Sequence, residues 1–203
     1  MRRQTDFFCR YIPLNHPDTP LNRRYTSVRR LQAVFCPPHT KRIGIAATIG
    51  VLTNIIGEKA NMINAQAIAK GKGIVIKESK IDKSDKYDDY VIVKLLSGTG
   101  STTEVRGTVF AGIPRLVGIN DFSFEMPIGK SMFFALYKDV PGVIGTVGKL
   151  FGDNNINIAQ MSVGRDEPKG KAVMVVALDH PVKDDLAKKI VAGGFEKAKF
   201  ITL

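Results

Sequence analysis

Four residues in the C-terminal third of the chain have the types and spacing of a small-ligand site: Tyr137, Asp139, Gly142 and Asn157. The Asp139 carboxylate can pair with an ammonium group, and the Asn157 amide can both donate and accept hydrogen bonds. Gly142 lets a ligand approach the backbone closely, and the free N–H groups of a helix that starts beside it can bind a carboxylate. We expect this set to bind a small zwitterion, such as a free amino acid.

Each residue alone has a simpler structural role. In this simpler interpretation, Asp139 does no more than cap the helix, and Asn157 does no more than start a strand. The order and spacing of the whole set favour the ligand site over these separate roles.

The elements around these residues follow a clear pattern. Short apolar runs predict strands over 132–137, 156–163, 172–178 and 198–203. Apolar residues at helical spacing predict helices over about 143–152 and 182–192. The resulting βαββαβ order over 129–203 predicts a ferredoxin-like domain.

Residues 43–128 predict a separate α+β domain, so the fold class of the chain is α+β. Helical spacing predicts a helix over about 44–57, and Asn61 is a candidate cap for a second helix that ends near Lys70. The later segments 74–76, 90–93, 103–110 and 115–119 are β-branched runs that predict strands. Pro127-Ile-Gly129 is a plausible joint between the two domains.

The segments Asp139–Gly145 and Ile156–Arg165 resemble the ACT domain, a small amino-acid-sensing module, in the form found in D-3-phosphoglycerate dehydrogenases. The segment Val105–Thr108, together with Pro114-Arg115, resembles the intervening, or allosteric substrate-binding, domain of that family. The same family's intervening domain usually opens with a strand, which residues 1–42 do not resemble. We therefore expect the domain at 43–128 to be truncated.

The resemblance implies that L-serine, or a related small amino acid, binds where two ACT domains meet side by side. It assigns Tyr137, Asp139 and Asn157 as side chains that hold the ligand, with Gly142 and Val143 in the backbone turn. It also implies a homodimer or higher oligomer. In the intervening domain, Arg115 matches a basic position of the family and is the candidate for an anion site.

The parent family is NAD-dependent, and its catalytic domains carry a Gly-x-Gly-x-x-Gly turn and a His–Glu pair that this sequence does not contain. Gly142, Gly145, Gly148 and Gly152 lie within a predicted helix, where we expect small residues to allow close packing on the sheet. We therefore expect a regulatory fragment with no catalytic residues and no cofactor or metal site of its own. The alternative hypothesis is that the chain is part of an active NAD-dependent phosphoglycerate dehydrogenase whose catalytic half is elsewhere, for example in a separate catalytic subunit.

The N-terminal 42 residues predict a basic, disordered leader, with nine Lys or Arg against two Asp and both cysteines of the chain. We expect a cytoplasmic protein. An Arg-rich, acid-poor start is also typical of an organellar transit peptide, and the protein is organellar if this leader is one. A weaker hypothesis is a nucleic-acid binder that uses the leader. No apolar run is long enough to predict a membrane span.

Overall fold

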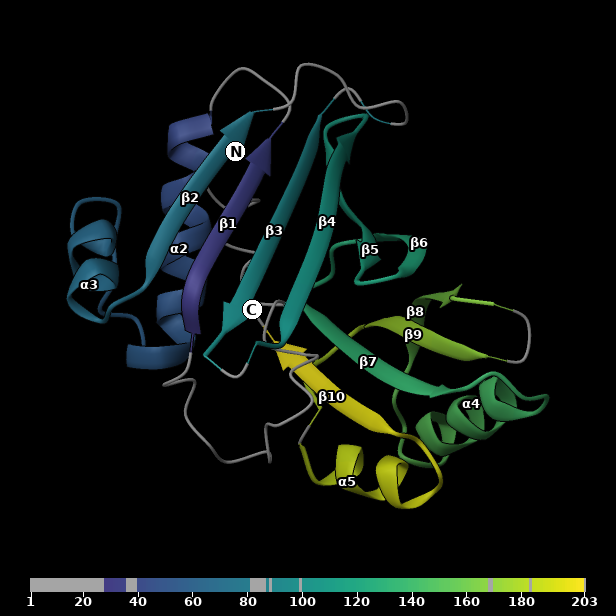
Figure 1. Ribbon diagram of the computed structural model, residues 1–203. Coiled ribbons are helices and arrows are strands. Elements are labelled where there is room, and N and C mark those ends of the chain that lie inside the picture. Colours follow the sequence, from purple (N-terminus) through teal and green to yellow (C-terminus); the bar gives the residue numbers. More distant parts are fainter. Residues whose placement is uncertain are drawn as a thin grey trace. The chain divides into compact units, whose positions relative to one another are not determined.

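The computed structural model describes residues 28–35, 40–80, 87, 89–98, 100–167, 170–182 and 184–202 (Figure 1). The chain divides into two compact units between Pro114 and Arg115. Both units mix helices with strands, so the α+β class predicted from the sequence is confirmed.

The first unit is a sheet with helices packed on it. Its elements in chain order are β1 (Val28–Phe35), α2 (Thr40–Ile56), α3 (Ala65–Gly71), β2 (Val75–Lys80), β3 (Tyr90–Ser97) and β4 (Thr102–Phe110). The strands lie in the order β2-β1-β3-β4, with β1 parallel to β2 and antiparallel to β3. Helix α2 connects the parallel strands and contacts both of them.

Strand β1 corrects the prediction of a leader without regular structure over residues 1–42. Leu31 and Ala33 are buried between β2 and β3, while Arg30 on the same strand is exposed. Arg29, Arg30 and Gln32 interrupt the apolar residues of this segment, so its local strand pattern is weak, and pairing on both sides is what orders it. The rest of the predicted leader, residues 1–27 and 36–39, lies outside the described residues. The transit peptide therefore stays a prediction.

The helix predictions in this unit are confirmed, with different starts. Helix α2 begins at Thr40, four residues before the predicted start near residue 44. Helix α3 begins at Ala65 rather than at the predicted cap Asn61. The Asn61 side-chain oxygen instead accepts hydrogen bonds from the backbone N–H groups of Ile63 and Asn64, in the turn that precedes the helix.

The second unit has the predicted ferredoxin-like order after a short hairpin. The hairpin strands are β5 (Ile113–Ile119), which starts just before the division, and β6 (Phe122–Pro127). The remaining elements are β7 (Ser131–Lys138), α4 (Val143–Asp153), β8 (Ile158–Arg165), β9 (Lys171–Leu178), α5 (Asp184–Ala192) and β10 (Lys197–Thr202). These strands form one antiparallel sheet in the order β10-β7-β9-β8.

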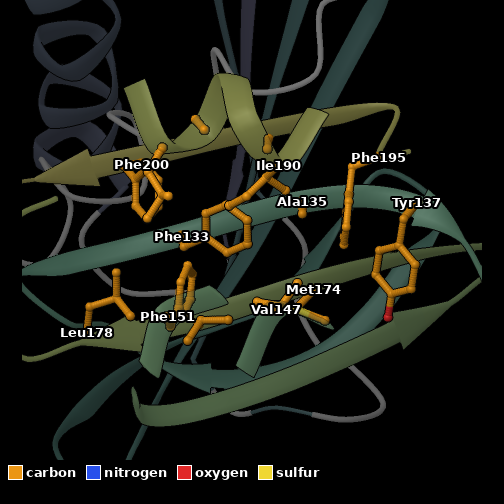
Figure 2. Packing of buried hydrophobic residues seen from close by; sticks show 14 of the residues in the cluster. Phe133, Ala135, Tyr137, Val147, Phe151, Met174, Leu178, Ile190, Phe195 and Phe200 are labelled. Atoms are coloured by element: carbon orange, nitrogen blue, oxygen red, sulfur yellow. The ribbon is translucent and has the colours of Figure 1, made fainter. Parts of the chain in front are cut away.

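Helices α4 and α5 cover one face of this sheet. Phe133 of β7 is fully buried, and its ring lies 5.2 Å from that of Phe151 and 4.9 Å from that of Phe200 (Figure 2). Val147 and Phe151 of α4 and Ile190 of α5 join the same cluster. This apolar layer holds the helices, and with them the turn before α4, in a defined place on the sheet.

Strand β6 was not predicted, and it packs on β8. A Cβ atom added to Gly164 of β8 would lie 2.8 Å from the carbonyl oxygen of Ser123 and 3.1 Å from the Phe124 ring. The neighbouring side chain of Val163 packs against the helix-side cluster, so Gly164 faces the opposite side of the sheet. Glycine at this position is what allows the close approach of β6.

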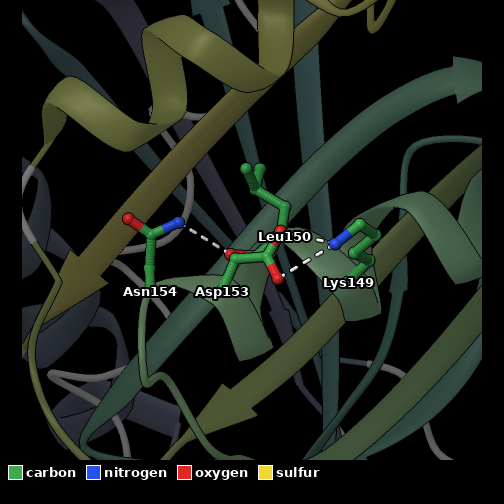
Figure 3. Close-up of polar contacts among 4 residues, drawn as sticks. All are labelled: Lys149, Leu150, Asp153 and Asn154. Atoms are coloured by element: carbon green, nitrogen blue, oxygen red, sulfur yellow. Dashed lines mark hydrogen bonds and ion pairs between the residues drawn. The ribbon is translucent and has the colours of Figure 1, made fainter.

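Helix α4 ends in a turn that uses asparagine. Lys149 pairs with Asp153 one turn later at 2.9 Å, and the Asn154 side chain donates to the Leu150 carbonyl at 2.8 Å (Figure 3). Asn155 has a φ of 54°, which lets the Ile156 N–H bond back to Phe151. The chain then enters β8 directly.

Candidate functional site

The candidate site is built on the turn between β7 and α4. The Asp139 N–H donates to the Gly170 carbonyl at 2.9 Å, which fixes the start of the turn. Gly142 then adopts a φ of 93°, a conformation that favours glycine, and α4 begins at the next residue, Val143. Thr146 donates to the Gly142 carbonyl through its N–H at 2.9 Å and through its hydroxyl at 3.1 Å.

The residues at the start of α4 are mostly exposed, among them Gly142, Ile144 and Gly145. Within the described part of the chain, no side chain caps this end of the helix. The helix dipole and the backbone N–H groups of the first turn favour an anion, such as a carboxylate. The structure thus has, at this turn, the backbone feature that the sequence predicts.

The glycines of α4 do not have the role predicted for them. A Cβ atom added to Gly145, Gly148 or Gly152 would find no atom within 4 Å among the described residues. The side of α4 that packs on the sheet carries Val147 and Phe151 instead. The prediction that these glycines pack on the sheet is wrong, because the apolar stripe of the helix decides which side faces the core.

Asp139 lies at the mouth of the turn and forms an ion pair within the chain. Its Oδ2 atom is 3.3 Å from Nε of Arg165, the last residue of β8. The Asp139 side chain is 17% exposed and that of Arg165 is 60% exposed. The carboxylate is therefore held close to the protein surface, while its partner is mostly in solvent.

Tyr137 is buried below the turn. Its side chain belongs to the helix-side cluster, and its ring lies 5.5 Å from the ring of Phe195 (Figure 2). Burial raises the pKa of the Tyr137 hydroxyl above its ordinary value of 10.0, and the Asp139 charge raises it further, while Arg165 lowers it. The three polar groups are therefore near one another, with the neutral phenol favoured.

Asn157 lies at the other end of the sheet. It precedes Ile158, which pairs with Leu178, whereas Asp139 follows Lys138, which pairs with Lys171. The eight residues of β9 separate these two pairs by about 24 Å along the strand. Asn157 is exposed, and its side-chain nitrogen donates to the Asp179 carboxylate.

One chain thus brings together four of the five predicted residues and leaves out Asn157. Strand β8 lies at an edge of the sheet and, among the strands described, pairs only with β9. A second copy paired antiparallel along this edge would bring its own Asn157 to the end where Asp139 lies, because the two β8 strands would run in opposite directions.

The exposed apolar side chains of the second unit gather at the same turn. Among its described residues, the large apolar side chains with the greatest exposure are Val140 at 46% and Ile144 at 53%. They lie on either side of Gly142. Exposed apolar side chains at a turn of this kind are typical of a surface that something else covers.

Arg115, the predicted anion-site residue, pairs across the β5–β6 hairpin with Glu125 at 2.9 Å. Its charge is balanced by that carboxylate, and the anion site stays a prediction. Among the described residues there is no group of three or more His, Cys, Asp or Glu side chains that could hold a metal, and no helix long and apolar enough to cross a membrane.

The sequence analysis did not assign a role to Arg165. Its approach to Asp139 depends on the register of three strands, because Arg165 and Tyr137 both pair with Ala172 of β9. In the sequence, the sign of this contact is the small Ala172, which leaves room for a long side chain to pass. The sequence does not show that Ala172 lies between Arg165 and Tyr137, because that depends on the strand register.

Two known protein families match the chain. Residues 34–120 match the family described as the D-3-phosphoglycerate dehydrogenase intervening domain, and residues 131–192 match the ACT domain. The chain therefore carries a D-3-phosphoglycerate dehydrogenase intervening domain and an ACT domain. The resemblance inferred from the sequence is thereby confirmed, and the turn at Asp139 lies in the ACT domain.

Several relatives carry the name D-3-phosphoglycerate dehydrogenase. The proteins of Synechocystis and Bacillus subtilis are each 34% identical to this chain, over 73% and 74% of its length. The protein of Archaeoglobus fulgidus is 32% identical over 75% of it. The chain spans 27% to 29% of the length of these relatives and matches their C-terminal part.

Proposed function

We propose that this region regulates a D-3-phosphoglycerate dehydrogenase of serine biosynthesis by binding L-serine or a closely related amino acid at its ACT domain. The observation that carries the proposal is the turn itself: Asp139 precedes by three residues the N-cap Gly142, which has a φ of 93°, and no side chain of the described residues caps the start of α4. A carboxylate and a helix N-terminus match the ammonium and carboxylate of a free amino acid. The relatives' shared name supports the choice of enzyme.

The site is completed by a second copy of the chain. Asn157 lies about 24 Å along the sheet from Asp139 in the same chain, so it contributes only if two β8 edges pair. Such pairing also covers an open strand edge, which proteins otherwise protect. The exposed Val140 and Ile144 flank the place where the ligand and the second copy meet.

Ligand binding at such a shared site stabilises the paired arrangement over others. Its effect is limited to the difference in its affinity for the two arrangements. In an enzyme that carries both this region and catalytic domains, the shift is passed on to NAD-dependent catalysis. The catalytic residues belong to those other domains.

The test is a titration of the protein with L-serine, glycine, L-alanine and the remaining amino acids, followed by calorimetry and thermal unfolding. A specific ligand raises the unfolding temperature with concentration. We expect Asp139→Asn and Asn157→Ala to abolish this response. Asp153→Asn is the matched control, because it removes an exposed carboxylate from the far end of α4. Absence of binding to every amino acid by the folded wild type refutes the proposal.

A further inference from the structure

The ion pair between Arg165 and Asp139 places a cation of the protein itself where the ligand's ammonium group is proposed to bind. Arg165 ends β8 and pairs in register with Ala172 of β9, which in turn pairs with Tyr137 of β7. Paired residues of neighbouring strands project to the same face of a sheet. Arg165 and Tyr137 therefore lie on one face, two strand spacings apart, with only the small, fully buried Ala172 between them.

The small side chain of Ala172 leaves room for Arg165 to reach the end of β7. With alanine at 172, the Arg165 side chain can cross over β9 and reach the end of β7, where its Nε atom comes to 3.3 Å from Asp139 Oδ2. The same guanidinium lowers the pKa of the Tyr137 hydroxyl, which Asp139 raises, so both charges act at one place.

The geometry of the pair is that of a displaceable contact. The Arg165 Nε and Asp139 Oδ2 atoms are 3.3 Å apart, longer than the roughly 2.7–2.9 Å of strong charge-assisted hydrogen bonds between arginine and carboxylate. Arg165 is 60% exposed and can turn into solvent, whereas Asp139 is 17% exposed and its backbone is tied to Gly170. Of the two groups, the arginine is the one that can leave.

We propose that Arg165 is the resident cation of the amino-acid site, which occupies the Asp139 carboxylate in the absence of ligand and is displaced by the ammonium group when an amino acid binds. This inference rests on the function proposed above and adds an internal competitor to it. Arg165 thereby sets the affinity of the site and restricts it to ligands with a free ammonium group. N-acetylated amino acids and 2-hydroxy acids lack the cation that replaces the arginine.

The expected effect follows from the worth of an exposed ion pair, which is small. Removal of the competitor tightens binding by about two- to fivefold, because the ligand no longer has to break the pair. The experiment measures the Kd of L-serine by calorimetry for the full chain and for Arg165→Gln, with N-acetyl-L-serine as the second probe. Arg165→Lys keeps a cation at the position and serves as the conservative variant.

The matched control is Lys171→Gln. Lys171 lies at the same end of the sheet and pairs with Glu196 at 2.9 Å, so its substitution changes the net charge equally without touching Asp139. We expect tighter serine binding for Arg165→Gln and wild-type affinity for Lys171→Gln. We expect no binding of N-acetyl-L-serine to the wild-type chain. Unchanged or weaker serine binding by Arg165→Gln overturns the inference, and weaker binding identifies Arg165 as a ligand contact instead.

A measurement without ligand separates this inference from the proposed function. Titration of Tyr137 by NMR is expected to show a higher pKa in Arg165→Gln and a lower one in Asp139→Asn, because the first variant removes the lowering charge and the second removes the raising charge. If Arg165→Gln leaves the Tyr137 pKa unchanged, the guanidinium is not at the site and the inference fails. If the shifts are seen but no amino acid binds the wild type, the proposed function fails, and the competitor role fails with it although the ion pair stands.

Discussion

The close packing of β6 on β8 makes the response to one substitution predictable in sign and size. Gly164→Ala adds a Cβ atom that would lie 2.8 Å from the Ser123 carbonyl oxygen, 3.1 Å from the Phe124 ring and 3.3 Å from the Ser123 carbonyl carbon. Two of these atoms belong to the backbone of β6, so the strain cannot be relieved by the rotation of a flexible side chain. The strand must move away from the sheet.

The magnitude follows from two opposing terms. Overpacking of a well-packed site costs about 1–3 kcal/mol. Replacement of glycine by alanine returns about 0.4–1 kcal/mol, because the unfolded chain loses freedom. The net loss is about 1–2 kcal/mol, which corresponds to a fall in Tm of about 4–15 °C for a unit of this size.

The control is the same substitution in the same unit at a glycine with open surroundings. An added Cβ at Gly148 of α4 finds no atom of the described residues within 4 Å, so Gly148→Ala is expected to raise stability by about 0.5–1 kcal/mol through helix propensity. Differential scanning calorimetry of the full chain should show the transition of this unit at a lower temperature in the first variant and at a higher temperature in the second. A Gly164→Ala protein that unfolds at or above the wild-type temperature would refute the packing of β6 on β8.

Two further predictions concern the ACT domain. Burial favours the neutral form of Tyr137 in the folded state, so the stability that this contributes is complete below pH 10 and is lost as the pH rises through the raised pKa. Between pH 9 and pH 11, the free energy of unfolding measured by denaturation should therefore fall less for Tyr137→Phe than for the wild type. An equal fall would contradict the burial of the hydroxyl. Pairing through β8 predicts that Ala159→Lys, an exposed position of that edge strand, converts dimers to monomers in sedimentation velocity, whereas Thr202→Lys on the opposite edge strand β10 does not. Dimers that survive the first variant and fail in the second would assign the interface to β10.

The ACT domain could be predicted from the sequence because each of its elements carries its own pattern. The stripe of Val143, Val147 and Phe151 predicts α4, and the run from Ala172 to Leu178 predicts β9 without knowledge of any partner. Gly142 and Asp139 follow β7 directly, so their place at the turn follows from the limits of two well-marked elements.

The missed elements depend on contacts far away in the chain. Leu31 and Ala33 are the buried residues among the described side chains of strand β1, and the strand is ordered by pairing with residues of β2 and β3 more than forty positions later. Strand β6 is a short run whose place depends on Gly164 in β8. Local patterns cannot reveal such elements, because tertiary pairing outweighs local propensity.

The candidate site shows the same division. Asp139, Gly142 and Val143 are close in sequence and were predicted together. The Arg165 ion pair and the distance to Asn157 both follow from strand register, which a single sequence does not determine. Register therefore decides which charges meet at the turn and which residue must come from a second copy.

The most direct test of the shared site is complementation between two defective chains. Asp139→Asn and Asn157→Ala each damage every site of their own dimer, but a mixed two-fold dimer has one site with both defects and one site with neither. Random mixing after unfolding and refolding should therefore restore L-serine binding at wild-type affinity to about a quarter of all sites. Binding that stays absent in the mixture, while each wild-type dimer binds serine, would contradict a site completed by the second copy.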